Sequence, residues 1–248
     1  MAEQKLEGRT ALITGASKGI GRAIAYAFAQ QGADVAATAR TTSRLESLAE
    51  DVRALGRRAL PITADLLHPT DVQRIADETL AEFSRIDILV NNAAIIHPRI
   101  PLTELDPQAW RDVIEVNITA AAMLTRAVLP SMIENGYGKI INISSIGGRK
   151  GGWGRSAYRV TKAGLISLTE SVAAEVKQYG IDVNCICPSA TDTEGYREAF
   201  NSRGIEDNPK MARPEQTAAL AVFLASDDSA VVTGTAIDAF GATNPLFS

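Results

Sequence analysis

The 248-residue chain has few of the residues that build disulfides and metal sites, with two histidines and two cysteines. Cys185 and Cys187 lie two positions apart in an apolar segment, so that in a strand they share a face and their backbone does not easily let them bridge. His68 and His97 are isolated from them and from each other. We therefore expect buried, reduced thiols and no metal site.

The sequence also lacks a run of charge of one sign, and its formal net charge is −4. Scattered Lys and Arg argue against a surface for nucleic acid or for an anionic membrane. We find no secretory-type apolar stretch near the N-terminus and no apolar run that we judge long enough to cross a bilayer. These absences predict a cytoplasmic protein whose partner is a small molecule.

Short apolar segments recur along the chain and alternate with helix-like segments. They are expected strands at residues 10–14, 34–38, 59–63, 86–91, 139–144, 182–186 and 236–238. Because these strands are apolar throughout rather than at every second residue, they indicate a mainly parallel sheet covered by helices on both faces. The sequence therefore predicts a doubly wound α/β fold with a seven-stranded sheet, formed by one domain over residues 1–248.

One long irregular stretch, residues 189–213, interrupts the pattern of short connections and follows a central strand. Loops of this length in a compact domain are usually disordered or functional. Its place after the carboxyl end of a strand favours a lid over a ligand site.

Three glycines, Gly15, Gly19 and Gly21, frame the turn between the first strand and the first helix. Gly15 permits the sharp exit from the strand, Gly19 lets backbone approach a pyrophosphate, and Gly21 allows close packing of helix and strand. The amides at the start of the helix are available to the anion. In this context the glycines predict a dinucleotide-binding site.

The second strand ends at Arg40, where a site for NAD would place an acidic residue on the ribose 2′-hydroxyl. A guanidinium can instead form a forked contact with a 2′-phosphate, and Lys18 in the glycine turn adds a second charge. The alternative is that both are solvated surface cations. Because two independent positions agree, we expect NADP(H) rather than NAD(H).

Tyr158 and Lys162 are four residues apart, which places them on one face of a helix. A tyrosine hydroxyl ordinarily has a pKa near ~10, and a neighbouring ammonium group favours its phenolate form. Taken alone, such a pair is often an ordinary solvated arrangement. Together with a dinucleotide site it predicts proton transfer to or from a carbonyl oxygen.

Five features follow one another along the chain: the glycine turn, the segment at residues 91–94 (Asn-Asn-Ala-Ala), Asn117, Ser145 and the Tyr158/Lys162 pair. Because of these features and their order, nearly the whole chain resembles the classical short-chain dehydrogenases/reductases. The interval between Ser145 and Tyr158 is the one that this family has between its serine and its tyrosine. The resemblance implies a Rossmann-type fold with Tyr158 as acid/base, Lys162 lowering its pKa and holding the nicotinamide ribose, and Ser145 steadying the substrate oxygen. It implies a water-linked proton relay for Asn117.

The same resemblance implies a set of cofactor-binding residues. They are Gly15, Ser17, Lys18, Gly19, Ile20, Gly21, Arg40, Asp65, Leu66, Asn91, Ala93, Tyr158, Lys162, Pro188 and Thr193. Asp65 would contact the adenine, although it could equally cap the turn or helix that follows. Asn91 would pin the central sheet, and Thr193 would meet the pyrophosphate or the carboxamide.

We expect a largely apolar pocket and a small ketone or aldehyde as substrate. The expected lining is Ile95, Ile96, His97, the loop at residues 147–154 with Trp153, and the lid around Ala190 and Tyr196. His97 could hydrogen-bond a polar substrate or simply be exposed. The expected assembly is a homotetramer, with the tail at residues 244–248 a candidate interface element.

Three alternatives stay open. The first is a 3-oxoacyl-[acyl-carrier-protein] reductase, whose basic docking positions we align by eye with Gly136 and Ala174, although Lys139 or Lys177 could substitute. The second is a non-catalytic NADP-sensing protein, which would not need an acid/base. The third is a lyase or epimerase, which would not consume NADPH.

Overall fold

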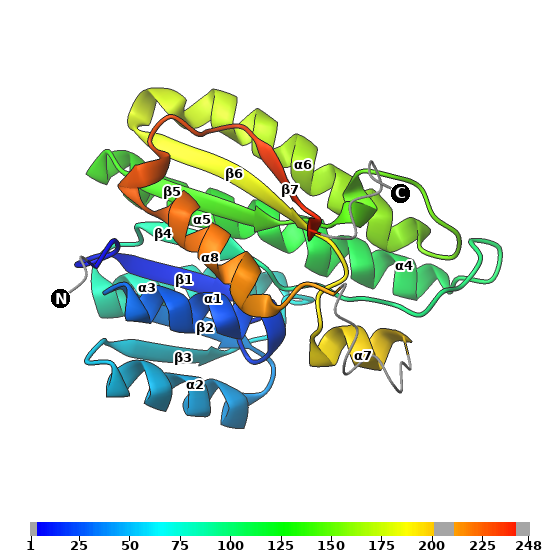
Figure 1. The fold of residues 1–248 in the computed structure, drawn as a ribbon, viewed down its shortest axis with the longest axis horizontal. Helices are drawn as coiled ribbons and strands as arrows, with labels where there is room; N and C mark the ends of the chain where they lie inside the picture. Colours follow the sequence, from blue (N-terminus) through cyan, green and yellow to red (C-terminus); the bar gives the residue numbers. More distant parts are fainter. Residues whose placement is uncertain (1–3, 201–210, 242–248) are drawn as a thin grey trace.

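The computed structural model describes residues 4–200 and 211–241, and its strands form one sheet in the order β3-β2-β1-β4-β5-β6-β7 (Figure 1). The strands are β1 (Thr10–Thr14), β2 (Asp34–Ala39), β3 (Ala59–Thr63), β4 (Ile88–Asn91), β5 (Gly138–Ile143), β6 (Ile181–Pro188) and β7 (Ala236–Ala239). Every neighbouring pair runs parallel. The doubly wound α/β prediction is confirmed, and the described sheet is parallel throughout.

Helices cover both faces of this sheet. They are α1 (Gly19–Gln30), α2 (Thr42–Ala54), α3 (Pro69–Phe83), α4 (Pro107–Ile114), α5 (Ala120–Asn135), α6 (Ser156–Val176), α7 (Glu194–Phe200) and α8 (Pro214–Ala225). Helices α1, α2 and α8 contribute to one apolar core, and α3, α5 and α6 contribute to the other. Short helical turns complete the chain at residues 115–119, 146–148, 177–179 and 227–229.

Local sequence signals fix several helix ends. Pro69 and Pro214 occupy the first positions of α3 and α8, where the missing amide hydrogen costs nothing. The side chain of Gln216 accepts a hydrogen bond from the Arg213 amide at 2.8 Å and so closes the start of α8. Gly136 has a φ of 61° and ends α5 in the left-handed conformation that glycine favours.

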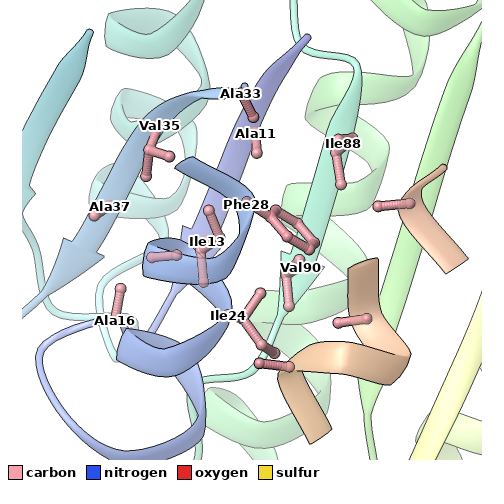
Figure 2. Close-up of a cluster of buried hydrophobic side chains, with 14 of the residues drawn as sticks. Ala11, Ile13, Ala16, Ile24, Phe28, Ala33, Val35, Ala37, Ile88 and Val90 are labelled. Carbon is pink, nitrogen blue, oxygen red and sulfur yellow. The ribbon is translucent and has the colours of Figure 1, made fainter. Parts of the chain in front are cut away.

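The core between α1 and the sheet explains why the strands are apolar at consecutive residues. Figure 2 shows Ile24 and Phe28 of α1 above Ala11 and Ile13 of β1. Leu12 points to the opposite face and belongs to the second core. Because both faces are covered, every residue of β1 is buried, as expected of a parallel sheet.

A continuous helical stretch, residues 107–135, passes through α4, a π-helical turn and α5, and by length and composition it is apolar enough to cross a membrane. The sequence analysis did not anticipate such a stretch. Leu124, Val128 and Met132 of α5 are buried in the second apolar core. A core helix meets the same length and composition criteria, and the packing of α5 against the sheet identifies it as one.

The predicted lid at residues 189–213 is only partly described. It contains α7, which lies beyond the carboxyl ends of the strands (Figure 1). Residues 201–210 of the lid, and the tail at residues 244–248, lie outside the described residues.

Candidate active site

A cavity of about 530 Å³ opens at the carboxyl edge of the sheet. Its walls come from the segments that follow each of the first six strands, β1 to β6. Ligands of open parallel sheets bind at this edge, where connections leave to opposite faces. The cavity brings together the glycine turn and the Tyr158/Lys162 pair, which are more than 130 positions apart in the sequence.

The glycine turn has the geometry that the sequence predicts. Gly15 and Gly19 have φ values of 66° and 57°, and a Cβ at Gly15 would lie 2.8 Å from the Cα of Ala93. A Cβ at Gly21 would lie 2.4 Å from the carbonyl oxygen of Gly15. Gly21 does not line the cavity, and it serves the close packing of α1 on the turn.

The start of α1 fits a pyrophosphate. Lys18 precedes the helix without a side-chain cap on its first amides, and the first turn carries no acidic residue. The positive end of the helix dipole therefore lies at the cavity, which Gly19 and Ile20 line. A ligand with phosphate groups matches this cradle.

Arg40 and Lys18 both line this end of the cavity, but their surroundings differ. Arg40 is exposed directly after β2. The Nζ of Lys18 lies 2.6 Å from a carboxylate oxygen of Glu198 on α7. This ion pair, which no local sequence pattern predicts, links the glycine turn to the lid.

Asp65 stabilises a turn and also lines the cavity. Asp65 lines the cavity beside Leu66, and its Oδ1 accepts a hydrogen bond from the amide of Leu67 at 3.1 Å. The carboxylate therefore shapes the turn after β3 while it faces the cavity. The other lining residues from the predicted cofactor set are Ser17, Ile20, Ala93, Pro188 and Thr193.

Asn91 does not line the cavity. It is buried, and its Nδ2 donates to the Oδ1 of Asn142 at 2.9 Å and to the hydroxyl of Thr125 at 3.1 Å. These bonds tie β4 to β5 and α5, which agrees with the sheet-pinning role that the resemblance implies. The following residue, Asn92, lines the cavity instead.

Ser145, Tyr158 and Lys162 meet at the cavity wall. A Cβ at Gly147 would lie 3.3 Å from a ring carbon of Tyr158 and 3.4 Å from the Oγ of Ser145, so the two side chains approach the same point. Ser144 is engaged elsewhere, because its Oγ donates to the backbone oxygen of Lys162 at 2.6 Å. The geometry therefore favours Ser145 over its neighbour, as the spacing to Tyr158 predicts.

Lys162 is 2% exposed, and its Nζ donates to the backbone oxygen of Ile143 at 2.7 Å. The same nitrogen lies 5.6 Å from the centroid of the Tyr158 ring. Burial lowers the pKa of Lys162 to about 8. The lysine is therefore a buried cation poised to lose its proton in weakly alkaline solution.

Burial raises the pKa of Tyr158, because the charged phenolate loses solvation. The neighbouring Ser145 hydroxyl and the charges of Arg155 and Arg159 act in the opposite direction. The sequence predicts this influence for Lys162, but Lys162 is not among the groups that lower the pKa of Tyr158. The positive charges that act on the phenol are those of the two arginines.

Asn117 lies in the π-helical turn between α4 and α5, a distortion that often marks functional positions. Its Oδ1 accepts from the amide of Ile95 at 2.7 Å, and its Nδ2 donates to the oxygen of Ile95 and to the hydroxyl of Thr161. Ile95 in turn lines the cavity. Asn117 therefore fixes the position of Ile95 in the cavity wall without lining the cavity itself.

The cavity lining is mainly apolar, as expected, and its substrate end also carries positive charge. Ile95, Ile96 and Trp153 line it as predicted, but so do three arginines that the sequence analysis missed: Arg99, Arg155 and Arg159. The signal for Arg155 was its position two residues after Trp153, directly before α6.

His97 does not line the cavity and is not exposed. It is 6% exposed, and its Nδ1 lies 2.7 Å from the backbone oxygen of Pro98. No group of three His, Cys, Asp or Glu suited to a metal occurs in the described part of the chain. Both cysteines are free and buried.

Comparison with known proteins agrees with this geometry. The family model described as short chain dehydrogenase matches residues 9–204. The 3-oxoacyl-[acyl-carrier-protein] reductase of Escherichia coli is 36% identical, with 92% of this chain and 94% of that protein covered. The cis-4-hydroxycyclohexanecarboxylate dehydrogenase of Sinomonas cyclohexanicum is 38% identical, with 91% and 92% covered.

Among solved structures, a candidate NAD(P)-dependent gluconate 5-dehydrogenase from Beutenbergia cavernae with bound NADP is 36% identical. It superimposes with a TM-score of 0.89 over 100% of both chains. The fold and these relatives agree, and the chain belongs to the short-chain dehydrogenase family, oxidoreductases that act on CH–OH and C=O groups with a nicotinamide cofactor.

Proposed function

We propose that the protein is an NADP(H)-dependent reductase of a small ketone or aldehyde, or the corresponding alcohol dehydrogenase. The observation that carries this proposal is the meeting of Ser145, Tyr158 and Lys162 with the glycine turn in one cavity. A site that holds a dinucleotide beside an acid/base pair suits hydride transfer at a carbonyl.

The preference for NADP(H) over NAD(H) rests on Arg40. Its exposed guanidinium stands where the second strand ends, and no acidic residue takes that position. A forked guanidinium matches a 2′-phosphate, and Lys18 adds charge nearby. NADPH, when bound, supplies the hydride.

Two hydroxyl groups, from Ser145 and Tyr158, would donate hydrogen bonds to the substrate oxygen as negative charge develops on it. Because burial raises its pKa, Tyr158 holds its proton at neutral pH and can deliver it to that oxygen. The resulting phenolate is stabilised by the positive charges around it, and it regains a proton from solvent. For alcohol oxidation, the phenolate takes the proton from the substrate hydroxyl.

Asn117 and Lys162 would support this proton transfer. The ammonium of Lys162 lies between the backbone of Ile143 and the Tyr158 ring, where it can hold the nicotinamide ribose. Asn117 fixes the backbone of Ile95 and, through water, would extend a proton path away from Lys162.

Reduction of 3-oxoacyl groups on a carrier protein is the second candidate, favoured by the similarity to the Escherichia coli enzyme. Lys139 weighs against it as a docking residue, because it is 4% exposed and its Nζ lies 2.6 Å from Asp182. It also lies at the amino end of β5, on the edge of the sheet opposite the cavity. Lys177 follows the end of α6 farthest from Tyr158.

The other elements of the proposal follow the sequence analysis. We propose a cytoplasmic homotetramer without nucleic-acid or membrane partners, built from single-domain subunits of residues 1–248 in which residues 189–213 act as a lid. An intact acid/base argues against a purely sensing role, and net NADPH consumption would exclude a lyase or epimerase.

The experiment is NADPH oxidation followed optically with a panel of small ketones, aldehydes, diketones and 3-oxoacyl thioesters. We expect turnover with free carbonyl compounds. Turnover restricted to carrier-bound thioesters would favour the second candidate, and NADPH binding without turnover of any carbonyl would contradict the proposed function.

A further inference from the structure

The loop at residues 147–154 carries five glycines and one large apolar side chain, that of Trp153. It ends two residues before α6, and Gly147, Gly152 and Trp153 line the cavity. Trp153 is 69% exposed, more than any other large apolar residue among the described residues that line the cavity. The proposed function leaves this indole without a role.

The backbone on the amino side of Trp153 is held by Arg159 of α6. The Arg159 guanidinium donates to the backbone oxygen of Lys150. A Cβ at Gly152 would lie 2.5 Å from the Cζ of Arg159, so the guanidinium occupies the space that any side chain at this position would need. Because Arg159 directly follows Tyr158, this contact ties the loop to the helix that carries the acid/base.

The backbone on the carboxyl side of Trp153 is held by the segment that follows β4. The oxygen of Gly154 accepts a hydrogen bond from the amide of Ile100 at 3.0 Å. Gly154 has a φ of 70°, in the left-handed region that favours glycine, and a Cβ there would lie 3.0 Å from the same Ile100 nitrogen. The residues around Trp153 are therefore fixed on both sides, while its side chain stays exposed.

An indole placed in this way is a ready surface for an apolar ligand. Covering it removes apolar area from water, and a planar ring gains further attraction from stacking or edge-to-face packing. Because the neighbouring backbone is already fixed, binding would cost little ordering of the loop. Ile95 and Ile96, from the segment that holds Gly154, add apolar surface to the same cavity.

We propose that the substrate carries a planar ring that packs on the Trp153 indole where the cavity opens to solvent, while its carbonyl meets Ser145 and Tyr158. This inference rests on the proposed function, and it narrows the substrate class to ring-bearing ketones or aldehydes. Trp153 is then a specificity-determining residue whose removal leaves the acid/base intact.

The competing occupant of this surface is a second copy of the chain, because exposed tryptophans are also buried at subunit contacts. The position of Trp153 in the cavity lining, five residues before Tyr158, favours the substrate. The two occupants predict different results for the same variant, which the second test uses.

The first test compares ketones with and without a ring. Methyl ketones with a phenyl group one, two or three methylene groups from the carbonyl would be assayed by NADPH oxidation beside linear methyl ketones of equal carbon number. For at least one chain length, we expect the phenyl compound to exceed its linear partner in kcat/KM by about 10-fold, the factor for one aromatic contact. Linear ketones that match their phenyl partners at every length would overturn the proposal.

The second test removes the indole. Trp153→Ala should lower kcat/KM for the preferred phenyl ketone by about 10-fold and leave its linear partner within about threefold, while Trp153→Phe keeps most of the preference. Leu102→Ala is the matched control, because Leu102 is 63% exposed and does not line the cavity. Equal losses for both ketones in Trp153→Ala, with or without a smaller assembly in sedimentation, would assign Trp153 to the structure or to a subunit contact and overturn the proposal.

A binding measurement separates this proposal from the proposed function. The chain has two tryptophans, so Trp110→Phe leaves Trp153 as its single indole. If no carbonyl is reduced, fluorescence titration of this variant with the phenyl ketones in the presence of NADP⁺ still reports on Trp153. A saturable change in emission that linear ketones do not produce would support the ring-binding surface although the reductase assignment had failed. Emission that no phenyl ketone changes would contradict the ring-binding surface itself.

Discussion

Lys139 and Lys162 are both more than nine-tenths buried, and both contact strand β5, but at opposite ends of it. Lys139 lies at the amino end, where its Nζ pairs with Asp182 at 2.6 Å. Lys162 lies at the carboxyl end, where its Nζ donates to the backbone oxygen of Ile143. One ammonium is matched by a carboxylate, and the other by a neutral carbonyl.

The amino edge repeats this matching at Asp87, which is 1% exposed. Its carboxylate accepts from the amide of Thr10 at 2.9 Å and pairs with Arg85 and Arg9. Buried charges there are satisfied within the chain, as stability requires. At the carboxyl edge, Lys162 has no carboxylate partner among the described residues, which is the arrangement expected of a charge that serves the proposed chemistry rather than the fold.

The same substitution at the two lysines should give opposite results. Lys162→Met should lower turnover by at least about 100-fold, because it removes charge beside the acid/base, and should raise the free energy of unfolding by about 1 kcal/mol. Lys139→Met should leave turnover within about threefold but lower that free energy by about 2 kcal/mol, because Asp182 loses its partner. Steady-state kinetics and urea unfolding of both variants measure the four values.

The pH dependence sharpens this contrast. The pKa of Lys162 is about 8 in the folded protein, below its ordinary value of 10.5. Between these pH values the unfolded chain binds more protons, so this group adds stability to the folded protein as pH rises through that window. The stability advantage of Lys162→Met over wild type should therefore shrink from pH 8 to pH 10, and an advantage that grows would contradict the assignment.

Cofactor discrimination tests the phosphate end of the same edge. Arg40→Gln should raise KM for NADPH by about 10- to 100-fold through loss of a forked contact to the 2′-phosphate. Kinetics with NADH should change little, which makes NADH the internal control. Equal losses with both cofactors would assign Arg40 a general electrostatic or structural role instead.

The smallest expected effect concerns the ion pair between Lys18 and Glu198 on α7. If Lys18 binds the cofactor phosphate, Glu198 competes for it, and Glu198→Gln should tighten NADPH binding by about twofold, as expected of an exposed pair. Glu194→Gln on the same helix is the matched control, since Glu194 is exposed. A fluorescence titration in which Glu198→Gln weakens binding would show that the pair supports the cofactor site.

The sequence predicted the sheet and the meeting of Ser145, Tyr158 and Lys162 because both rest on local spacing. Consecutive apolar residues indicate that β1 is covered by helices on both faces of the sheet. The interval between Ser145 and Tyr158 in the sequence predicts that their side chains meet at the cavity wall. The cradle at Gly15 and Gly19 was equally readable, since their positive φ values favour glycine.

Other features depend on contacts that no local pattern reveals. The ion pair of Lys18 joins residues 180 positions apart, and the burial of His97 follows from packing of a loop that has no periodic pattern. The arginines of the substrate end come from two segments that only the fold brings together. The apolar lining was expected from Ile95, Ile96 and Trp153, whereas the three arginines in the same segments were not expected.

The most direct test of the account is the initial rate of NADPH oxidation by wild-type protein and by Tyr158→Phe with the best carbonyl substrate. Loss of the phenolic proton should lower kcat by about 1,000-fold or more while NADPH binding and the unfolding transition stay unchanged. A Tyr158→Phe protein that reduces the carbonyl at the wild-type rate would contradict the assignment of the carboxyl edge as the site of proton transfer.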